Sequence, residues 1–137
     1  MLRSGEQIYG LTVLQHCGGG AYGEVYYCCD ASGKELALKV VSKAKVGSGW
    51  KRELKGITHY RKLAGDAPGL LTLYHVGEDE DTFYYTMELA DALPGQSEYK
   101  ADTLAARLAN RALPQEQLIP VLTAILDNIR TLHEAGF

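Results

Sequence analysis

The sequence predicts an α+β fold in which a five-stranded antiparallel sheet with one helix is followed by two further helices. Runs rich in aromatic and β-branched residues alternate with turn-forming residues, which is typical of short strands. Apolar residues recur at helical spacing in other stretches, and a glycine-rich segment joins the first two strands. The expected strands are residues 9–16, 25–29, 35–41, 69–76 and 82–88, and the expected helices are residues 50–64, 101–110 and 115–135.

Length and composition favour one ordinary globular domain with a real core. The chain has 137 residues, of which 46% are hydrophobic and 23% charged. A net charge of −3 gives no reason to expect nucleic acid or a membrane surface as a partner. Neither a signal peptide nor a membrane-spanning run is visible, so a cytoplasmic location is expected.

The cysteines Cys17, Cys28 and Cys29 are odd in number, and two of them are adjacent in an expected strand. This pattern is not a disulfide framework, and it lacks the second ligand pair of a zinc site. We interpret these residues as reduced, half-buried strand cysteines of a cytosolic protein. The histidines are scattered, so no metal site is predicted.

The glycine-rich segment reads Gly-x-Gly-x-x-Gly-x-Val from Gly18 to Val25. Such a match alone can mark an ordinary turn. In a dinucleotide-binding fold the third glycine opens a helix, whereas Gly23 opens a β-type run. The Gly-Lys-Ser/Thr of a Walker-type loop is also missing. The segment therefore predicts a loop between two strands that can lie over phosphate groups.

Lys39 and Glu53 are unusual for their positions. Lys39 lies mid-strand among apolar residues, and alternation places it on the same face as Ala37. Glu53 falls within the apolar stripe of helix 50–64, where a carboxylate needs a cation. We therefore predict that the two form an ion pair. The alternative for Lys39 is an exposed position on an edge strand, and the alternative for Glu53 is a water-exposed position at the rim of the helix.

The remainder of the chain divides by composition. The acidic turn 77–81 is expected to be a solvated hairpin tip. In helix 115–135, Pro114 fits the first turn, Pro120 is expected to kink the start, and Gly136 fits the stop. The expected parts are a sheet-forming part of residues 1–89, a linker of residues 90–100, and a helical part of residues 101–137; the family resemblance given next makes these a lobe, a hinge with its linker, and an incomplete helical lobe.

These motifs, in this order, resemble the eukaryotic-type (Hanks-type) serine/threonine protein kinases from about Tyr9 to the last residue. The resemblance rests on Gly18, Gly20, Gly23 and Val25 of the glycine-rich loop, Ala37-Leu38-Lys39 of the third strand, Glu53 of the C-helix, Met87-Glu88-Leu89-Ala90 of the gatekeeper and hinge, and residues 131–137 before the catalytic loop.

The resemblance implies that ATP, with Mg²⁺, binds here. Lys39 would hold the α- and β-phosphates, positioned by Glu53, and these two are the expected catalytic residues. Val25 and Ala37 would cover the adenine ring, with Met87 limiting the depth of the pocket. The adenine edge would bond to the backbone of Glu88 and Ala90. The expected cofactor-binding set is Gly18, Gly20, Gly23, Val25, Ala37, Lys39, Met87, Glu88 and Ala90.

The sequence departs from the family pattern at its end. It stops about where the His-Arg-Asp loop should begin, so no catalytic base or magnesium ligand can be assigned. We expect the ATP-binding part of a kinase, inactive alone, that would act on a protein hydroxyl in the intact protein. The apolar stripe of helix 115–135 also predicts self-association. The alternatives are a pseudokinase or half-kinase binding module and, less favoured, a dinucleotide-binding oxidoreductase.

Overall fold

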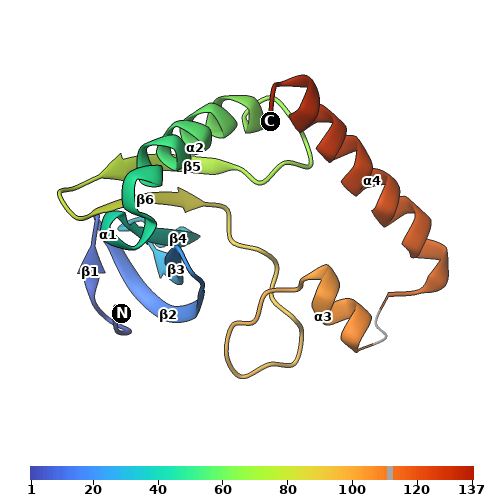
Figure 1. Ribbon diagram of the computed structural model, residues 1–137. Helices are drawn as coiled ribbons and strands as arrows, with labels where there is room; N and C mark the ends of the chain where they lie inside the picture. Colours follow the sequence, from blue (N-terminus) through green and yellow to red (C-terminus); the bar gives the residue numbers. More distant parts are fainter. Residues whose placement is uncertain (111–112) are drawn as a thin grey trace. The chain divides into compact units, whose positions relative to one another are not determined.

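The computed structural model describes residues 1–110 and 113–137, which form two compact units (Figure 1). The first, here called the sheet unit, comprises Met1–Gly65 and Leu71–Leu89. The second, here called the helical unit, comprises Asp66–Leu70 and Ala90–Phe137.

The sheet unit contains an antiparallel sheet with one long helix against it, which confirms the predicted fold class. The strand order is β1-β2-β3-β4-β6-β5. Strand β1 was not predicted, and β2 and β3 extend further into the glycine-rich segment than expected. The strands are β1 (Gln7–Ile8), β2 (Leu11–Gly19), β3 (Gly23–Cys29), β4 (Glu35–Ser42), β5 (Leu73–Glu78) and β6 (Thr82–Met87).

Strand β1 exists because Tyr9 and Gly10 form a two-residue turn. Both have positive φ, 52° and 77°, and Ile8 pairs with Leu11 across the turn. This conformation suits a right-twisted hairpin but is unusual for tyrosine. The Tyr9 ring stacks on Tyr84, with 3.5 Å between ring centroids, which helps to hold the turn. The expected first strand therefore begins at Leu11, not at Tyr9.

Apolar side chains pack on both faces of the sheet. Helix α2 (Trp50–Ala64) has the predicted bounds and covers one face. A helical turn, α1 (Lys43–Val46), and a 3₁₀ turn (Gly47–Gly49) occupy the expected connector. One face buries Leu11, Val13, Tyr26, Cys28, Leu36 and Leu38, and the other buries Val41, Leu73, Phe83 and Tyr85 against Trp50, Leu54, Ile57 and Tyr60 of α2.

The cysteines differ in their surroundings. Burial raises the pKa of the Cys28 thiol to about 11, so this side chain is a neutral part of the core. Cys29 is half-buried, as expected, but Cys17 is exposed because it lies where β2 approaches the glycine-rich turn. In the described ranges, His, Cys, Asp and Glu form no group of three or more that could hold a metal ion.

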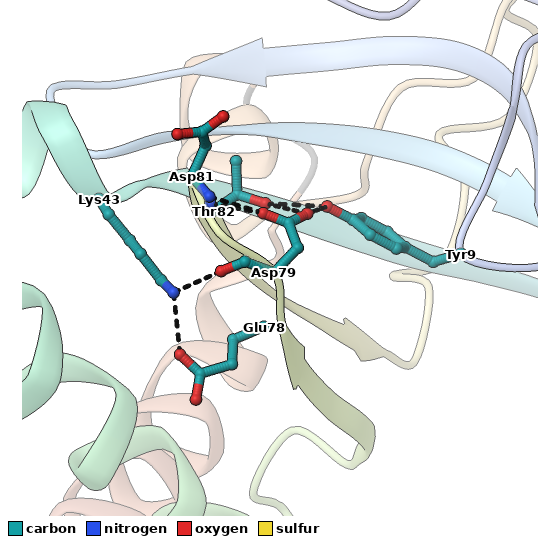
Figure 2. Close-up of polar contacts among 6 residues, drawn as sticks. All are labelled: Tyr9, Lys43, Glu78, Asp79, Asp81 and Thr82. Carbon is teal, nitrogen blue, oxygen red and sulfur yellow. Dashed lines mark hydrogen bonds and ion pairs between the residues drawn. The ribbon is translucent and has the colours of Figure 1, made fainter.

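The turn between β5 and β6 is an ordered network around Asp79 (Figure 2). Its carboxylate accepts hydrogen bonds from the Tyr9 hydroxyl at 2.7 Å, the Thr82 hydroxyl at 2.9 Å and the Thr82 amide at 2.8 Å. Lys43 of α1 pairs with Glu78 at 2.9 Å and donates to the Asp79 carbonyl. The bonds to its carboxylate lower the pKa of Asp79 to about 2, with the Tyr9 hydroxyl as the largest cause.

Replacing Tyr9 with phenylalanine should raise the pKa of Asp79 part of the way from about 2 towards its ordinary value. A pKa lower in the folded than in the unfolded protein contributes stability above about pH 4, and this is lost as the pH falls towards 2. The variant should therefore lose less stability over this range. Carboxylate NMR titration and acid unfolding measure both effects. Tyr22→Phe, at an exposed ring, is the control; an unchanged Asp79 pKa in Tyr9→Phe would contradict the assignment.

The helical unit contains α3 (Leu104–Ala109) and α4 (Gln115–Glu134). Pro114 precedes α4 and Pro120 lies inside it, while Gly136, with a φ of 90°, follows its end. Before α3 the chain closes on itself, because Leu93 donates to the Lys100 carbonyl at 2.8 Å and Ala92 bridges to Ala101. The expected linker of residues 90–100 is therefore an ordered loop.

Helix α4 exposes much of its apolar stripe, including Ile119, Leu122, Ile125, Leu126 and Ile129. It is also tied to the start of the unit, since the Asn128 amide donates to the Gly69 carbonyl at 3.1 Å. Across the described ranges, no helix has both the length and the apolar character needed to cross a lipid bilayer.

Candidate functional site

The glycine-rich segment forms a hairpin between β2 and β3. Pairing continues through Gly18 with Val25 and Gly19 with Glu24, so the turn itself is short. The Gly20 amide donates to the Gly23 carbonyl at 2.9 Å and closes the turn. The predicted loop between two strands is therefore present as an ordered hairpin.

Two glycines of this hairpin differ in whether the fold requires glycine at their position. Gly23 is buried, and a Cβ there would collide with the Val40 carbonyl oxygen and lie 3.2 Å from the Cα of Val41. A Cβ on Gly20 would meet nothing within 4 Å. Gly23 is thus needed for the close approach of β3 to β4, whereas at Gly20 the fold alone gives no reason for glycine.

A contact between His16 and Glu24, at ion-pair distance, joins the two strands of the hairpin. The Nε2 atom of His16 in β2 lies 2.7 Å from Oε2 of Glu24 in β3, and both side chains are partly buried. Sequence reasoning missed this contact. The register between His16 and Gly18 is shifted by a bulge, so simple hairpin counting does not place His16 near Glu24. The bridge ties together the strands that flank the turn.

Several of the predicted site residues lie on one face of the sheet. Val25 pairs with both Gly18 and Lys39, and Lys39 pairs with Tyr85. Directly paired residues of antiparallel strands present their side chains on the same face. Ala37 pairs with Met87 on that same face, since each lies two residues from a member of this row. The sheet register thus brings Val25, Ala37, Lys39 and Met87 together beside the hairpin.

Lys39 is half-buried, and its ammonium lies 5.6 Å from the centroid of the Tyr85 ring. No ion pair among the described residues involves Lys39. A ring face stabilises a cation only modestly compared with an anion. The predicted face of Lys39 is correct, but the predicted carboxylate partner is not beside it.

Glu53 lies in the first turn of α2 and is half-buried rather than fully covered. It lines a hollow of about 400 Å³ with Tyr22 from the tip of the hairpin, Val46 and Arg52. The expected Lys39–Glu53 ion pair is therefore absent from this conformation. The physical reason is that Glu53 stays accessible to water near the helix N-terminus, where a carboxylate is favourable without a partner. Tyr22 was not among the predicted site residues.

The predicted hinge residues fall at the end of the sheet unit and the start of the helical unit. The Glu88 amide donates to the Thr72 carbonyl at 3.0 Å, and its carboxylate accepts from the Thr72 amide at 2.9 Å. Ala90 begins the helical unit, and its carbonyl accepts from the Tyr99 hydroxyl at 3.0 Å. The backbone of Glu88 is thus held to Thr72, the residue directly before β5.

The chemistry of the sheet face fits a phosphate-bearing ligand. Lys39 supplies a half-buried cation that lacks a carboxylate among the described ion pairs. The open space at Gly20 leaves backbone at the hairpin turn accessible to a bulky anion. Carboxylate clusters suited to Mg²⁺ are not found in the described ranges, so a metal ion here would depend on ligands from the nucleotide or from elsewhere.

Comparison with known proteins identifies the family and the fold of this chain. Residues 11–137 match the protein kinase domain family. Among solved structures, the fold is similar to a cysteine-to-alanine mutant of the Mycobacterium tuberculosis PknI kinase domain, with a TM-score of 0.72 and 24% identity over 99% of this chain and 53% of that chain. A second PknI kinase-domain structure gives a TM-score of 0.71 and 24% identity over 99% and 52%. No curated protein matches the sequence.

The chain therefore spans about half the length of the solved kinase domains that it matches. The family match covers both the sheet unit, from β2 onwards, and the helical unit. The chain belongs to the protein kinase domain family.

Proposed function

We propose that this chain is the ATP-binding part of a serine/threonine protein kinase, in which the intact protein transfers a phosphoryl group to a protein hydroxyl. The observation that supports this most strongly is the row of Gly18, Val25 and Lys39 on one sheet face beside the glycine hairpin. ATP would supply the phosphoryl group, and the protein would contribute positioning and neutralisation of charge.

In this proposal each residue has a distinct physical role. The hairpin backbone at Gly20 approaches the phosphates, and Lys39 moves from the Tyr85 ring to the α- and β-phosphate oxygens. Glu53 then approaches Lys39 and orients it. Val25 and Ala37 cover the adenine ring, Met87 limits the depth of the pocket, and the backbone of Glu88 and Ala90 binds the adenine edge.

Calorimetric titration of the 137-residue chain with ATP, with and without Mg²⁺, tests the proposal. We expect saturable binding of ATP and no comparable binding of NAD⁺, since the hairpin leads into a strand and not into a helix. Preferential binding of NAD⁺ would favour a dinucleotide-binding domain. Absence of ATP binding at millimolar concentration would contradict the proposal.

The second candidate is a nucleotide- or partner-binding module without catalysis. The separation of Lys39 from Glu53 favours it, because a catalytically aligned lysine requires its glutamate. ATP binding is compatible with both candidates. They differ in phosphoryl transfer to a protein substrate by the full-length protein.

The proposal also accounts for the exposed apolar stripe of α4. In a complete kinase domain, such a stripe would be covered by the rest of the helical lobe, as apolar faces of this size are seldom left in water. Self-association of the 137-residue chain through the same stripe stays a prediction.

A further inference from the structure

Residues 91–102, which precede α3, form a closed loop within the helical unit. The Asp102 amide donates to the Asp91 carbonyl at 2.7 Å, and this bond closes the base of the loop. Residues 94–98 at its tip are exposed, so the loop is held at its base. Most connections in compact domains need only about 4–6 residues. A longer loop with paired ends therefore indicates a role beyond connection.

Tyr99 returns from this loop to the residue that begins the helical unit. Its hydroxyl donates to the Ala90 carbonyl at 3.0 Å, and its side chain is half-buried, whereas residues 94–98 are exposed. Because backbone bonds close the base of the loop, the tyrosine is already held near Ala90. Little further conformational entropy is then lost when the hydroxyl binds the carbonyl. The contact therefore follows from the closure of the loop.

The Ala90 carbonyl lies in backbone to which the proposed function gives a role in binding adenine. Residues 88–91 continue the chain from β6 without a turn or a bend. In an extended chain, the N–H and C=O groups of one residue point to the same side. An Ala90 amide that donates to N1 of adenine would therefore have its carbonyl beside position C2 of the base. Adenine carries only hydrogen at C2 and needs no acceptor there.

We propose that Tyr99 is a specificity-determining residue of the nucleotide site. By donating to the Ala90 carbonyl, it withholds this acceptor from the base and so favours adenine over purines that carry an amino group at C2. Although a carbonyl oxygen has two lone pairs, a second donor would have to approach beside the Tyr99 hydroxyl. An amino group that loses its water without gaining an acceptor weakens binding. This inference rests on the proposed function, because it assigns a role within the same site.

The affinities of ATP, 2-aminoadenosine triphosphate and 2-methyladenosine triphosphate, measured by calorimetry, test the proposal. The amino compound adds one donor at C2, whereas the methyl compound adds a group of similar size without a donor. For the unchanged 137-residue chain, we expect the amino compound to bind no more than about twofold more tightly than ATP. For Tyr99→Phe, which frees the carbonyl, we expect it to bind about three- to tenfold more tightly than ATP, the effect of one neutral hydrogen bond. The methyl compound should gain nothing in either protein.

Tyr60→Phe is the matched control. The hydroxyl of Tyr60 in α2 also donates to a backbone carbonyl, that of Leu71, over the same distance of 3.0 Å. This variant loses the same kind of bond in the sheet unit and leaves the Ala90 carbonyl bound, so its ratio of the two affinities should equal that of the unchanged chain. A general loss of stability would weaken ATP and the amino compound alike and would not change the ratio. Thermal melts check that both variants are folded.

The role of Tyr99 and the proposed function fail in different ways. If the unchanged chain binds ATP but the ratio stays the same in Tyr99→Phe, the role of Tyr99 is wrong and the proposed function stands. An equal rise of the ratio in Tyr60→Phe would also remove the role of Tyr99. Equal gains by the amino and methyl compounds would mean that the variant opens space and does not free an acceptor. Absence of ATP binding by the unchanged chain would contradict the proposed function, and this inference with it.

Discussion

Substituting Lys39 by methionine should weaken ATP binding by about 10- to 100-fold, the effect of removing a charge-assisted contact worth about 1.5–3 kcal/mol. Methionine preserves much of the length of the side chain while removing the ammonium. Lys39 has no ion-pair partner among the described contacts, so its removal leaves no carboxylate unpaired. The loss of affinity would then report the contact with phosphate, together with the approach of Glu53 to Lys39 that we propose for the ATP-bound protein.

The matched control is Lys45→Met, which makes the same chemical change at an exposed lysine of α1. Calorimetry with ATP and with adenosine separates the effects, since adenosine lacks the phosphates and should bind both variants alike. If Lys39→Met bound ATP as tightly as Lys45→Met, Lys39 would not be the phosphate-binding residue. The proposed nucleotide site would then lose its main support.

Replacing Gly23 by alanine should destabilise the sheet unit by about 1–3 kcal/mol, the usual cost of forcing an extra group into a packed interior. The added Cβ would collide with the Val40 carbonyl, and backbone atoms cannot move aside as the end of a flexible side chain can. Either β3 separates from β4 or the hairpin shifts. Thermal or urea unfolding measures this loss.

Gly20→Ala is the control for stability and a test of function in the same hairpin. Its Cβ would project into open space, so the unfolding free energy should change by less than about 0.5 kcal/mol. If the hairpin backbone approaches the phosphates, the same variant should bind ATP more weakly while remaining folded. Unchanged ATP affinity would mean that the turn does not contact the nucleotide. Equal destabilisation by both variants would contradict the packing described for Gly23.

Some features of the site could be predicted because they depend only on local periodicity. Alternation along β4 placed Lys39 and Ala37 on one face, and the structure shows them there with Val25 and Met87 as paired neighbours. A helical repeat placed Trp50, Leu54, Ile57 and Tyr60 on one stripe, and this stripe packs on the sheet. Strands and helices have fixed repeats, so the facing of each residue follows from its position.

Other features depended on how separate elements meet. The Lys39–Glu53 ion pair was predicted because each charged side chain lies on an apolar face and needs a partner of opposite charge. In the structure, the placement of α2 leaves Glu53 beside Tyr22 and Lys39 beside Tyr85. The bridge between His16 and Glu24 depends on a bulge that changes the register of β2 against β3. Such contacts require distances between elements, which periodicity does not contain.

The amino-acid sequence by itself determined the α+β class, the glycine hairpin, the inward face of Lys39 and the bounds of α2, since turn residues and apolar repeats act within a few residues of one another. Only the tertiary structure decided that Tyr9 and Gly10 form a turn held by Tyr84, and that Glu53 lies apart from Lys39. These arrangements depend on packing between distant segments, where small shifts of a helix or a strand register decide which charges and rings come into contact.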